Sequence, residues 1–294
     1  MPAAEVDVPP ELVRGLLAEQ HPDLAGLPLE LMANGWDNVM CRLGRDYVVR
    51  LPRRAAAAGL VVHEQQWLPL LAPRLPLPVP APVRVGRPGL GYPWSWSVVP
   101  FIPGQVAAST PPADPQEAAA SLGAFLGRLH SPAPPDAPAN PFRGTPLAGR
   151  RESVLANLDA VDGMADRDAV ARDWEAAAAL PGWDRPPVWL HGDLHAANML
   201  VHEGRLSGVI DFGDITSGDP AADLSAAWMV LPTGCHGRLR EAYRAASGHT
   251  IDDVTWARAR GWALGLSVVF LAHSADNPLL AGIGRRTFEA IRGS

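Results

Sequence analysis

The chain has 294 residues, of which 47% are hydrophobic and 19% charged, and its formal net charge is −6. This composition excludes a largely disordered chain, and the length suffices for one large domain or for two lobes that meet at a cleft. The negative charge argues against a general nucleic-acid binder and is compatible with a cationic substrate.

The basic residues exclude several kinds of chemistry. The chain contains no lysine, so all 25 basic residues are arginines. Schiff-base and pyridoxal enzymes need a lysine, and so does the Walker P-loop, so these classes are excluded. Cys41 and Cys235 lie far apart without C-x-x-C spacing, which argues against a disulfide framework and a cysteine zinc site.

The chain shows no signal for membrane insertion. Residues 1–10 lack a basic stretch followed by an apolar run, and the longest apolar run, around residues 262–272, is too short to span a bilayer. We therefore expect a cytoplasmic protein without a membrane partner.

The first third of the chain reads as a small β-rich part. A helix is predicted over Pro10–Gln20, where leucines recur at helical spacing, and a longer helix that carries Glu64 over Ala55–Leu71. A proline-rich stretch at residues 73–82 predicts an extended connector. Short strands, separated by turn-forming residues, are predicted at Leu29–Met32, Val39–Leu43, Tyr47–Leu51, Pro82–Val85 and Trp94–Phe101.

The remainder reads as mainly helical, after a turn at Ile102-Pro103-Gly104. An apolar stripe predicts a core helix over Pro115–His130, and a proline-rich loop follows to about Pro146. Strands are predicted at Val188–Leu190, Met199–His202 and Arg205–Ile210, the last two joined as a hairpin. Further helices are predicted over Gly149–Leu158, Arg167–Leu180, Pro220–Val230, His236–Ala246, Asp252–His273 and Pro278–Ile291.

One compound motif carries the functional prediction. The stretch His191-Gly192-Asp193-Leu194-His195-Ala196-Ala197-Asn198 is followed, 13 residues after Asn198, by Asp211-Phe212-Gly213. In phosphoryl transfer, positioning and charge neutralisation supply nearly all of the catalysis. Asp193 can accept the proton of an attacking hydroxyl, and Asn198 and Asp211 offer the oxygen ligands that Mg²⁺ prefers. A single loop aspartate is usually a turn or cap residue, but five identities at two spacings favour the functional interpretation.

These segments resemble the aminoglycoside phosphotransferase family of the protein-kinase-like superfamily. The likeness also covers Gly35-Trp36-Asp37-Asn38, residues 47–52 and residues 218–224. It implies an α+β, bilobal protein-kinase-like fold, with a small β-rich N-terminal lobe (residues 1–101, one main helix) and a larger, mainly helical C-terminal lobe (residues 102–294). It implies ATP or GTP as donor, Mg²⁺ as cofactor, Asp193 as catalytic base and Asn198 and Asp211 as metal ligands. It also implies an adenine-contacting hinge with Val98, Pro100 and Ile102.

The chain departs from the kinase pattern at two places. The strand position that holds a phosphate-pairing lysine is Arg50, with Glu64 as the expected ion-pair partner, and arginine can bind phosphate or carboxylate. The alternative is that Arg50 is a surface strand residue. No G-x-G-x-x-G precedes the strands, so Gly35 alone stands in the expected phosphate loop.

Other polar residues receive less specific predictions. Asp219 before Pro220 reads as a helix cap, and Asp223 as a brace for the catalytic loop. His191 is expected to hold the backbone of that loop, and His195 to be a local structural residue. Asp214 and Asp276 could face the acceptor and attract an amine, or be solvated.

The acceptor is predicted to be a small hydroxyl compound, with an aminoglycoside as first choice. A macrolide, another antibiotic or a metabolite remains an alternative. Two rival classes are open at this point. His191 and His195 are four residues apart like a zinc pair, but no H-E-x-x-H pattern supports a metallohydrolase. A catalytically silent kinase-fold binding protein is the second rival.

Overall fold

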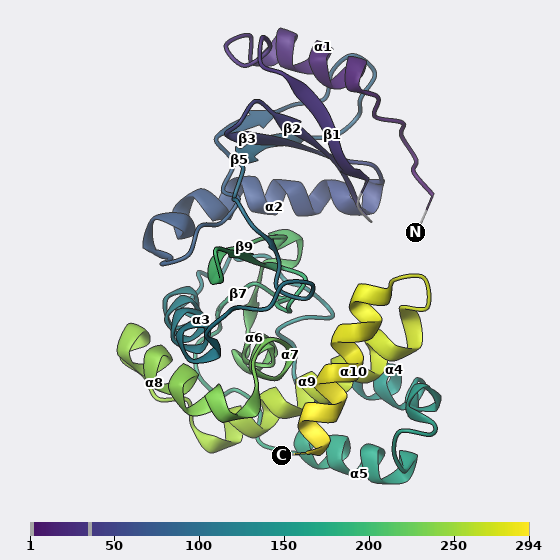
Figure 1. The fold of residues 1–294 in the computed structure, drawn as a ribbon, viewed down its shortest axis with the longest axis vertical. Coiled ribbons are helices and arrows are strands. Elements are labelled where there is room, and N and C mark those ends of the chain that lie inside the picture. Colours follow the sequence, from purple (N-terminus) through teal and green to yellow (C-terminus); the bar gives the residue numbers. More distant parts are fainter. Residues whose placement is uncertain (1–2, 35–36, 294) are drawn as a thin grey trace. The chain divides into compact units, whose positions relative to one another are not determined.

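The computed structural model describes residues 3–34 and 37–293. The chain divides into two compact units, residues 1–73 with 78–102, and residues 74–77 with 103–294 (Figure 1). The first unit is β-rich with one long helix, and the second is mainly helical. The α+β class is therefore as predicted. Among the described residues, no helix is both long and apolar enough to cross a bilayer.

The first unit is built on an antiparallel sheet in the order β1-β2-β3-β5-β4. The period-two alternation of β3 divides its side chains between two faces. Val49 and Leu51 belong to the apolar cluster that includes Val13 and Leu16 of the first helix, whereas Arg50 contacts the second helix. The elements are α1 (Pro10–Gln20), β1 (Leu29–Asn34), β2 (Asn38–Leu43), β3 (Tyr47–Pro52), α2 (Ala55–Leu71), β4 (Arg84–Gly86) and β5 (Trp96–Pro100).

The second unit surrounds two small sheets with helices. The sheets have the orders β6-β8-β9 and β10-β7. The helices are α3 (Pro115–Leu129), α4 (Arg151–Leu155), α5 (Arg167–Ala178), α6 (Ala221–Leu224), α7 (Ala226–Val230), α8 (His236–Ser247), α9 (Asp253–His273) and α10 (Pro278–Arg292). The strands are β6 (Gln105–Val106), β7 (Val188–Leu190), β8 (Met199–His202), β9 (Arg205–Val209) and β10 (Thr216–Gly218).

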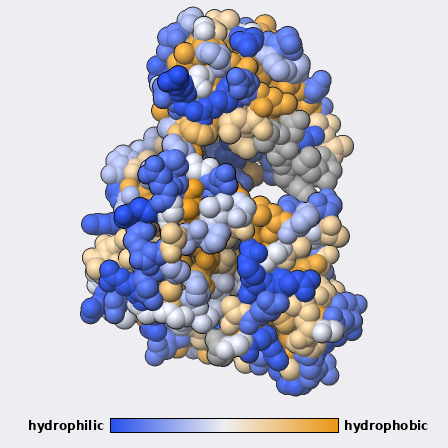
Figure 2. All heavy atoms as spheres, in the orientation of Figure 1, coloured by the Kyte–Doolittle hydropathy of each residue, from blue (hydrophilic) through white to orange (hydrophobic). Residues whose placement is uncertain are grey.

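The helices of the second unit form its core. Helix α3 packs along α8, and the long helix α9 contacts α5, α6 and α10 (Figure 1). Trp174, Trp262, Phe125 and Phe288 are buried among them. On the face of the molecule drawn in Figure 2, hydrophilic and hydrophobic residues are interspersed. The core thus holds two short sheets whose loops carry the chemistry-bearing motif.

Candidate active site

The backbone of the loop that carries Asp193 is held by the buried carboxylate of Asp223. Asp223, at the start of the α6 region, accepts the N–H of His191 at 2.7 Å and that of Gly192 at 2.9 Å. Its side chain is fully buried, and His130 Nε2 lies 3.5 Å from it. The predicted bracing role of Asp223 is confirmed. The two backbone N–H groups just before Asp193 are therefore fixed by a buried acceptor.

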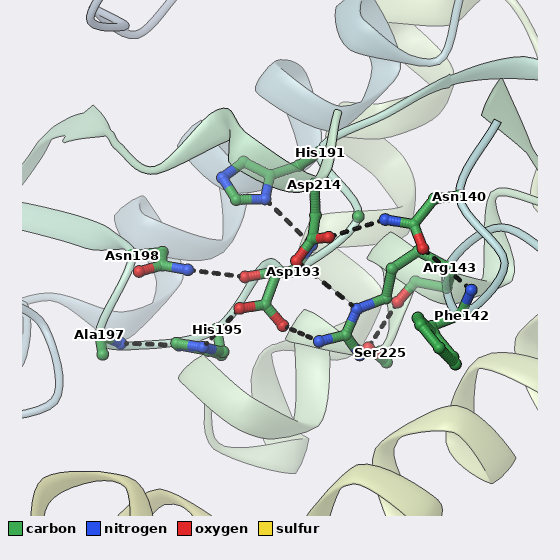
Figure 3. A network of polar contacts seen from close by, with 12 residues as sticks. Asn140, Phe142, Arg143, His191, Asp193, His195, Ala197, Asn198, Asp214 and Ser225 are labelled. Carbon is green, nitrogen blue, oxygen red and sulfur yellow. Dashed lines mark hydrogen bonds and ion pairs between the residues drawn. The ribbon is translucent and has the colours of Figure 1, made fainter. Parts of the chain in front are cut away.

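Each carboxylate oxygen of Asp193 has a partner (Figure 3). Arg143 Nη2 donates to Oδ1 at 2.5 Å, and His195 Nε2 lies 3.3 Å from Oδ2. Burial by itself raises the pKa of the Asp193 carboxyl. The charge of Arg143 and the contact with His195 outweigh this effect and lower that pKa well below its usual range. Asp193 is therefore ionised at neutral pH, as a proton acceptor must be.

The two histidines of the motif have local structural roles. His191 Nδ1 accepts the N–H of Asp193 at 3.2 Å, so Nε2 carries the proton and donates to the Ile210 carbonyl at 2.9 Å. His195 Nδ1 likewise accepts the N–H of Ala197 at 3.2 Å, which leaves Nε2–H for Asp193. Since each ring uses both nitrogens, the histidines are not arranged as a zinc-binding pair. Among the described residues, no group of three or more His, Cys, Asp or Glu is arranged to hold a metal.

The predicted metal ligands stand at the open end of the β8–β9 hairpin. Met199 pairs with Val209, and the N–H of Ile210 donates to the Asn198 carbonyl at 2.9 Å. Asn198 therefore lies opposite Ile210, the residue that precedes Asp211. Asn198 Nδ2 donates to the Asp193 carbonyl at 2.9 Å, and Figure 3 shows its Oδ1 pointing away. Asp211 is exposed with a left-handed φ of 64°, an uncommon conformation for a residue with a Cβ.

A second group of polar side chains, around the predicted residue Asp214, lies next to Asp193, and its members Arg143 and Asn140 were not predicted. Arg143 Nε lies 3.9 Å from Asp214 Oδ2, and Asn140 Nδ2 donates to Asp214 Oδ1 at 2.7 Å (Figure 3). Burial and the neighbouring carboxylates of Asp193 and Asp211 raise the pKa of Asp214, and Arg143 and Asn140 offset part of this effect. Asp214 thus lies near Asp193, as its candidate role at the acceptor requires.

Asp219 has a structural role. Its Oδ1 accepts the N–H of Ala221 at 3.0 Å, the first residue of α6, whereas the residue at the N-terminal boundary of the helix is Pro220 rather than Asp219. Arg258, which is 3% exposed, adds a two-pronged ion pair with Nε to Oδ2 at 2.7 Å and Nη2 to Oδ1 at 3.1 Å. This pair ties the segment after β10 to the core helix α9.

In the first unit, Arg50 and Glu64 form a buried ion pair, which excludes the surface-residue alternative for Arg50. Arg50 Nη1 lies 2.5 and 2.7 Å from the Glu64 oxygens, and the two residues are 9% and 3% exposed. The Asn38 side-chain oxygen, in the amide orientation that satisfies both groups, accepts from Arg50 Nη2 and Nε. Sequence reasoning missed Asn38, although the β2–β3 pairing brings it near.

The remaining predicted residues lie as follows. Val98 is buried in β5 between β3 and β4, and Pro100 pairs with Tyr47 at the end of the ladder. Ile102 follows beyond the last pair, where the backbone is no longer part of the sheet. Asp276 is exposed in the turn between α9 and α10, and Gly35 lies outside the described residues.

A model of a known protein family matches most of this chain. The model of a family described as "Phosphotransferase enzyme family" matches residues 28–262. An aminoglycoside 3'-phosphotransferase of Escherichia coli is 30% identical over 143 residues, which is 47% of this chain and 53% of that protein. A second one from the same organism aligns over 42% of its length, so the chain spans about half the length of the curated relatives it matches.

Solved structures share the fold at low identity. A GDP complex of aminoglycoside 2'-phosphotransferase-IIIa has a TM-score of 0.65 at 20% identity, with 96% of this chain and 97% of that chain covered. Macrolide 2'-phosphotransferase MphH from Brachybacterium faecium has a TM-score of 0.63 at 22% identity, with 95% and 97% covered. At these identities the likeness concerns the fold alone.

Proposed function

Because the chain belongs to the phosphotransferase enzyme family, we propose that it transfers the γ-phosphoryl group of ATP or GTP to a hydroxyl group of a small molecule. The resemblance drawn from the motifs is thereby confirmed at the level of the family. One observation carries the proposal: a braced loop and the adjoining hairpin bring Asp193, Asn198 and Asp211 to one end of the small sheets.

Asp193 has the proposed role of catalytic base. An acceptor hydroxyl that donates to its carboxylate is oriented for attack, and the proton passes to Asp193 as the new P–O bond forms and the bond to the leaving diphosphate breaks. The His195 ring and the Arg143 guanidinium hold the two carboxylate oxygens in place. The low pKa makes Asp193 a weak base, which suits a loose transition state in which the proton moves late.

Asn198 and Asp211 have the proposed role of magnesium ligands. Their side chains provide hard oxygen donors, and the amide orientation of Asn198 leaves Oδ1 free of the Asp193 contact. Bound Mg²⁺ would neutralise charge on the triphosphate oxygens. A set of two protein ligands supports Mg²⁺, because this ion keeps waters and phosphate oxygens as its other ligands.

The donor nucleotide is assigned to the first unit. Arg50, which is fixed by Glu64 and Asn38, has the proposed role of pairing with the phosphates of the donor. Gly35 is proposed to belong to the loop that contacts these phosphates. Val98, Pro100 and Ile102 have the proposed role of adenine contact. The GDP bound to aminoglycoside 2'-phosphotransferase-IIIa supports a nucleotide donor, and GTP is therefore a candidate donor as well as ATP.

For the acceptor, the names of the relatives favour an aminoglycoside. Related structures are described with kanamycin, streptomycin and gentamicin, and a macrolide kinase supports the alternative class. Asp214 and Asp276 have the proposed role of attracting an amine of such an acceptor. The cytoplasmic location stays a prediction.

The deciding test compares the wild type with Asp193→Asn in a coupled assay of ADP and GDP release with Mg²⁺. We expect acceptor-stimulated release by the wild type and a loss of about 10² to 10⁴-fold in the variant. Asp184→Asn, which removes an exposed carboxylate in the same unit, is the control and is expected to act like the wild type. An active Asp193→Asn variant contradicts the catalytic role, and nucleotide binding without turnover by the wild type favours the silent binding protein.

A further inference from the structure

Backbone packing holds Arg143 beside Asp193, although its segment has no helix or strand. A Cβ on Gly218 would lie 2.1 Å from the Gly144 carbonyl oxygen, so the backbone directly after Arg143 lies against strand β10. The N–H of Asp219 donates to the same carbonyl at 3.2 Å. Strand β10 pairs with β7, which leads into the Asp193 loop. One small sheet therefore positions both Arg143 and the proposed base.

Most of the hydrogen-bonding capacity of Arg143 is unused. Within the described residues, its guanidinium makes one hydrogen bond, from Nη2 to Asp193 Oδ1 at 2.5 Å, while the 3.9 Å approach of Nε to Asp214 is too long for one (Figure 3). The side chain is 18% exposed, so the remaining N–H groups are accessible to a ligand. A planar guanidinium with unused donors suits the oxygens of a phosphoryl group.

Arg143 lies close to the bond that forms in the proposed reaction. His195 Nε2 approaches Asp193 Oδ2 to only 3.3 Å, so Oδ2 is the less occupied oxygen for the acceptor hydroxyl. That hydroxyl lies about 2.7 Å from the carboxylate oxygen to which it donates, and phosphorus lies about 3 to 3.5 Å from an attacking oxygen. The reacting phosphorus therefore comes within roughly 6 Å of the carboxylate that already bonds Arg143.

The charges around Asp193 give this arginine a role during the transfer. Asp193, Asp211 and Asp214 lie close together, and a single guanidinium cannot balance three carboxylates, so the proposed cationic acceptor is still attracted. Before the reaction, Asp193 is the nearer counter-charge of Arg143, at 2.5 Å compared with 3.9 Å for Asp214. When Asp193 takes the proton of the hydroxyl it becomes neutral, and the charge of Arg143 is left to interact with the phosphoryl oxygens.

We propose that Arg143 is a further catalytic residue, which donates hydrogen bonds to the oxygens of the phosphoryl group while that group passes from the donor to the acceptor. This inference rests on the proposed phosphotransferase function and adds a group to its site. In the step, the acceptor oxygen bonds to phosphorus, the bond from phosphorus to the leaving nucleoside diphosphate breaks, and Asp193 receives the hydroxyl proton. Arg143 keeps all of its protons and stabilises the negative charge that is spread over the phosphoryl oxygens.

The first experiment measures the binding of fluoroaluminate, a mimic of the transferring phosphoryl group, to protein saturated with Mg²⁺ and with ADP or GDP, whichever binds more tightly. No acceptor is present, so the orientation of an acceptor by Asp193 does not enter the measurement. By calorimetry, we expect Arg143→Ala to bind fluoroaluminate at least ~10-fold more weakly than the wild type, with the affinity for the diphosphate unchanged. Equal binding of fluoroaluminate by the two proteins, or none by the wild type, overturns the proposal.

The matched control is Arg151→Ala. Arg151 belongs to the same unit, but it is exposed and pairs with Glu175. We expect this variant to bind fluoroaluminate as the wild type does. Weakening as large as that of Arg143→Ala would show that the loss of any arginine charge in this unit suffices, which contradicts a contact from Arg143.

The second experiment compares the donor with its γ-thio analogue, in which sulfur replaces one oxygen of the transferred group. Sulfur is a weak acceptor, so a contact from Arg143 adds to the rate loss that the analogue causes. We expect the ratio of the two rates to be the same in the wild type and Arg151→Ala, and at least ~3-fold smaller in Arg143→Ala. Equal ratios in all three proteins reduce Arg143 to a residue that positions Asp193, and the proposal is then wrong.

The proposal and the proposed function fail separately. The binding of fluoroaluminate needs no turnover, so it tests Arg143 whether or not an acceptor has been found. Wild-type turnover that is lost in Asp193→Asn, together with equal behaviour of Arg143→Ala and the wild type, leaves the proposed function intact and removes Arg143 from the catalytic residues.

Discussion

Gly192 and Asp214 approach so closely that a Cβ on Gly192 would lie 2.3 Å from the Asp214 carbonyl oxygen. Gly192 also has a φ of +89°, which disfavours every residue with a Cβ. Through this contact, the segment that follows Asp211 packs directly against the backbone that precedes Asp193. The distance between the proposed base and the proposed metal ligands is therefore set by backbone packing.

Gly192→Ala is expected to lower phosphoryl transfer by at least ~10²-fold, because the loop must move by more than a side chain can absorb. Unfolding in urea should also show a loss of stability of about 1 to 3 kcal/mol from the strained backbone. Gly182→Ala is the control, since a Cβ there meets no atom within 4 Å. Equal activity of the Gly192→Ala variant and the wild type would contradict the close approach.

Removal of Arg50 should destabilise the first unit. Arg50→Met leaves Glu64 as a buried carboxylate without its main cation, and we expect a loss of about 3 to 5 kcal/mol in chemical unfolding together with weaker nucleotide binding. Arg84→Met removes an ion pair whose side chains are 47% and 55% exposed, and it should cost less than about 1 kcal/mol. Similar losses in both variants would show that burial of the Arg50 pair has no energetic consequence.

Asp223 should contribute stability that depends on pH. Burial opposes its ionisation, but the nearby His130 ring and the N–H of Gly192 lower the pKa of Asp223 below its ordinary value. A lowered folded-state pKa gives stability that is present above the unfolded pKa of about 3.9 and is lost as the pH falls through the folded value. Asp223→Asn should therefore be less stable than the wild type at pH 6, and the gap should close below about pH 4. A gap that widens toward acid pH contradicts this assignment.

Asn198→Ala should raise the Mg²⁺ concentration needed for half-maximal activity by roughly 10-fold or more, because one of the two proposed protein ligands is lost. Added Mg²⁺ should then restore part of the rate, which distinguishes a ligand from a purely structural residue. Asn157→Ala, whose amide bonds the Ser153 carbonyl in α4, should keep the Mg²⁺ dependence of the wild type.

Most elements and the motif could be predicted because local signals determine them, whereas the short strands β6 and β10 were not predicted and the helix expected over Pro220–Val230 is divided into α6 and α7. The helices at residues 10–20 and 115–130 are indicated by apolar residues three or four positions apart. The strands are delimited by turn-forming residues between them. The roles of Asp219 and Asp223 followed from their place at the start of a helix and beside the motif. These are short-range relationships that a single sequence contains.

Arg143, Asn140 and Asn38 were missed for a physical reason. Arg143 is 50 residues from Asp193, in a proline-rich segment without periodicity, and tertiary contacts such as the β7–β10 ladder and the Gly144–Gly218 approach bring it to the base. Asn38 reaches Arg50 through strand pairing, whose register depends on both strands. Such contacts arise from tertiary packing, for which the sequence holds no local pattern.

The close contact between Gly144 and Gly218 restricts which residues can occupy these two positions. It fixes the backbone directly after Arg143, the residue that contacts Asp193. A side chain in place of either glycine would push the two backbones apart and move Arg143 away from the Asp193 carboxylate. The position of this arginine is therefore set by two residues that carry no side chain of their own.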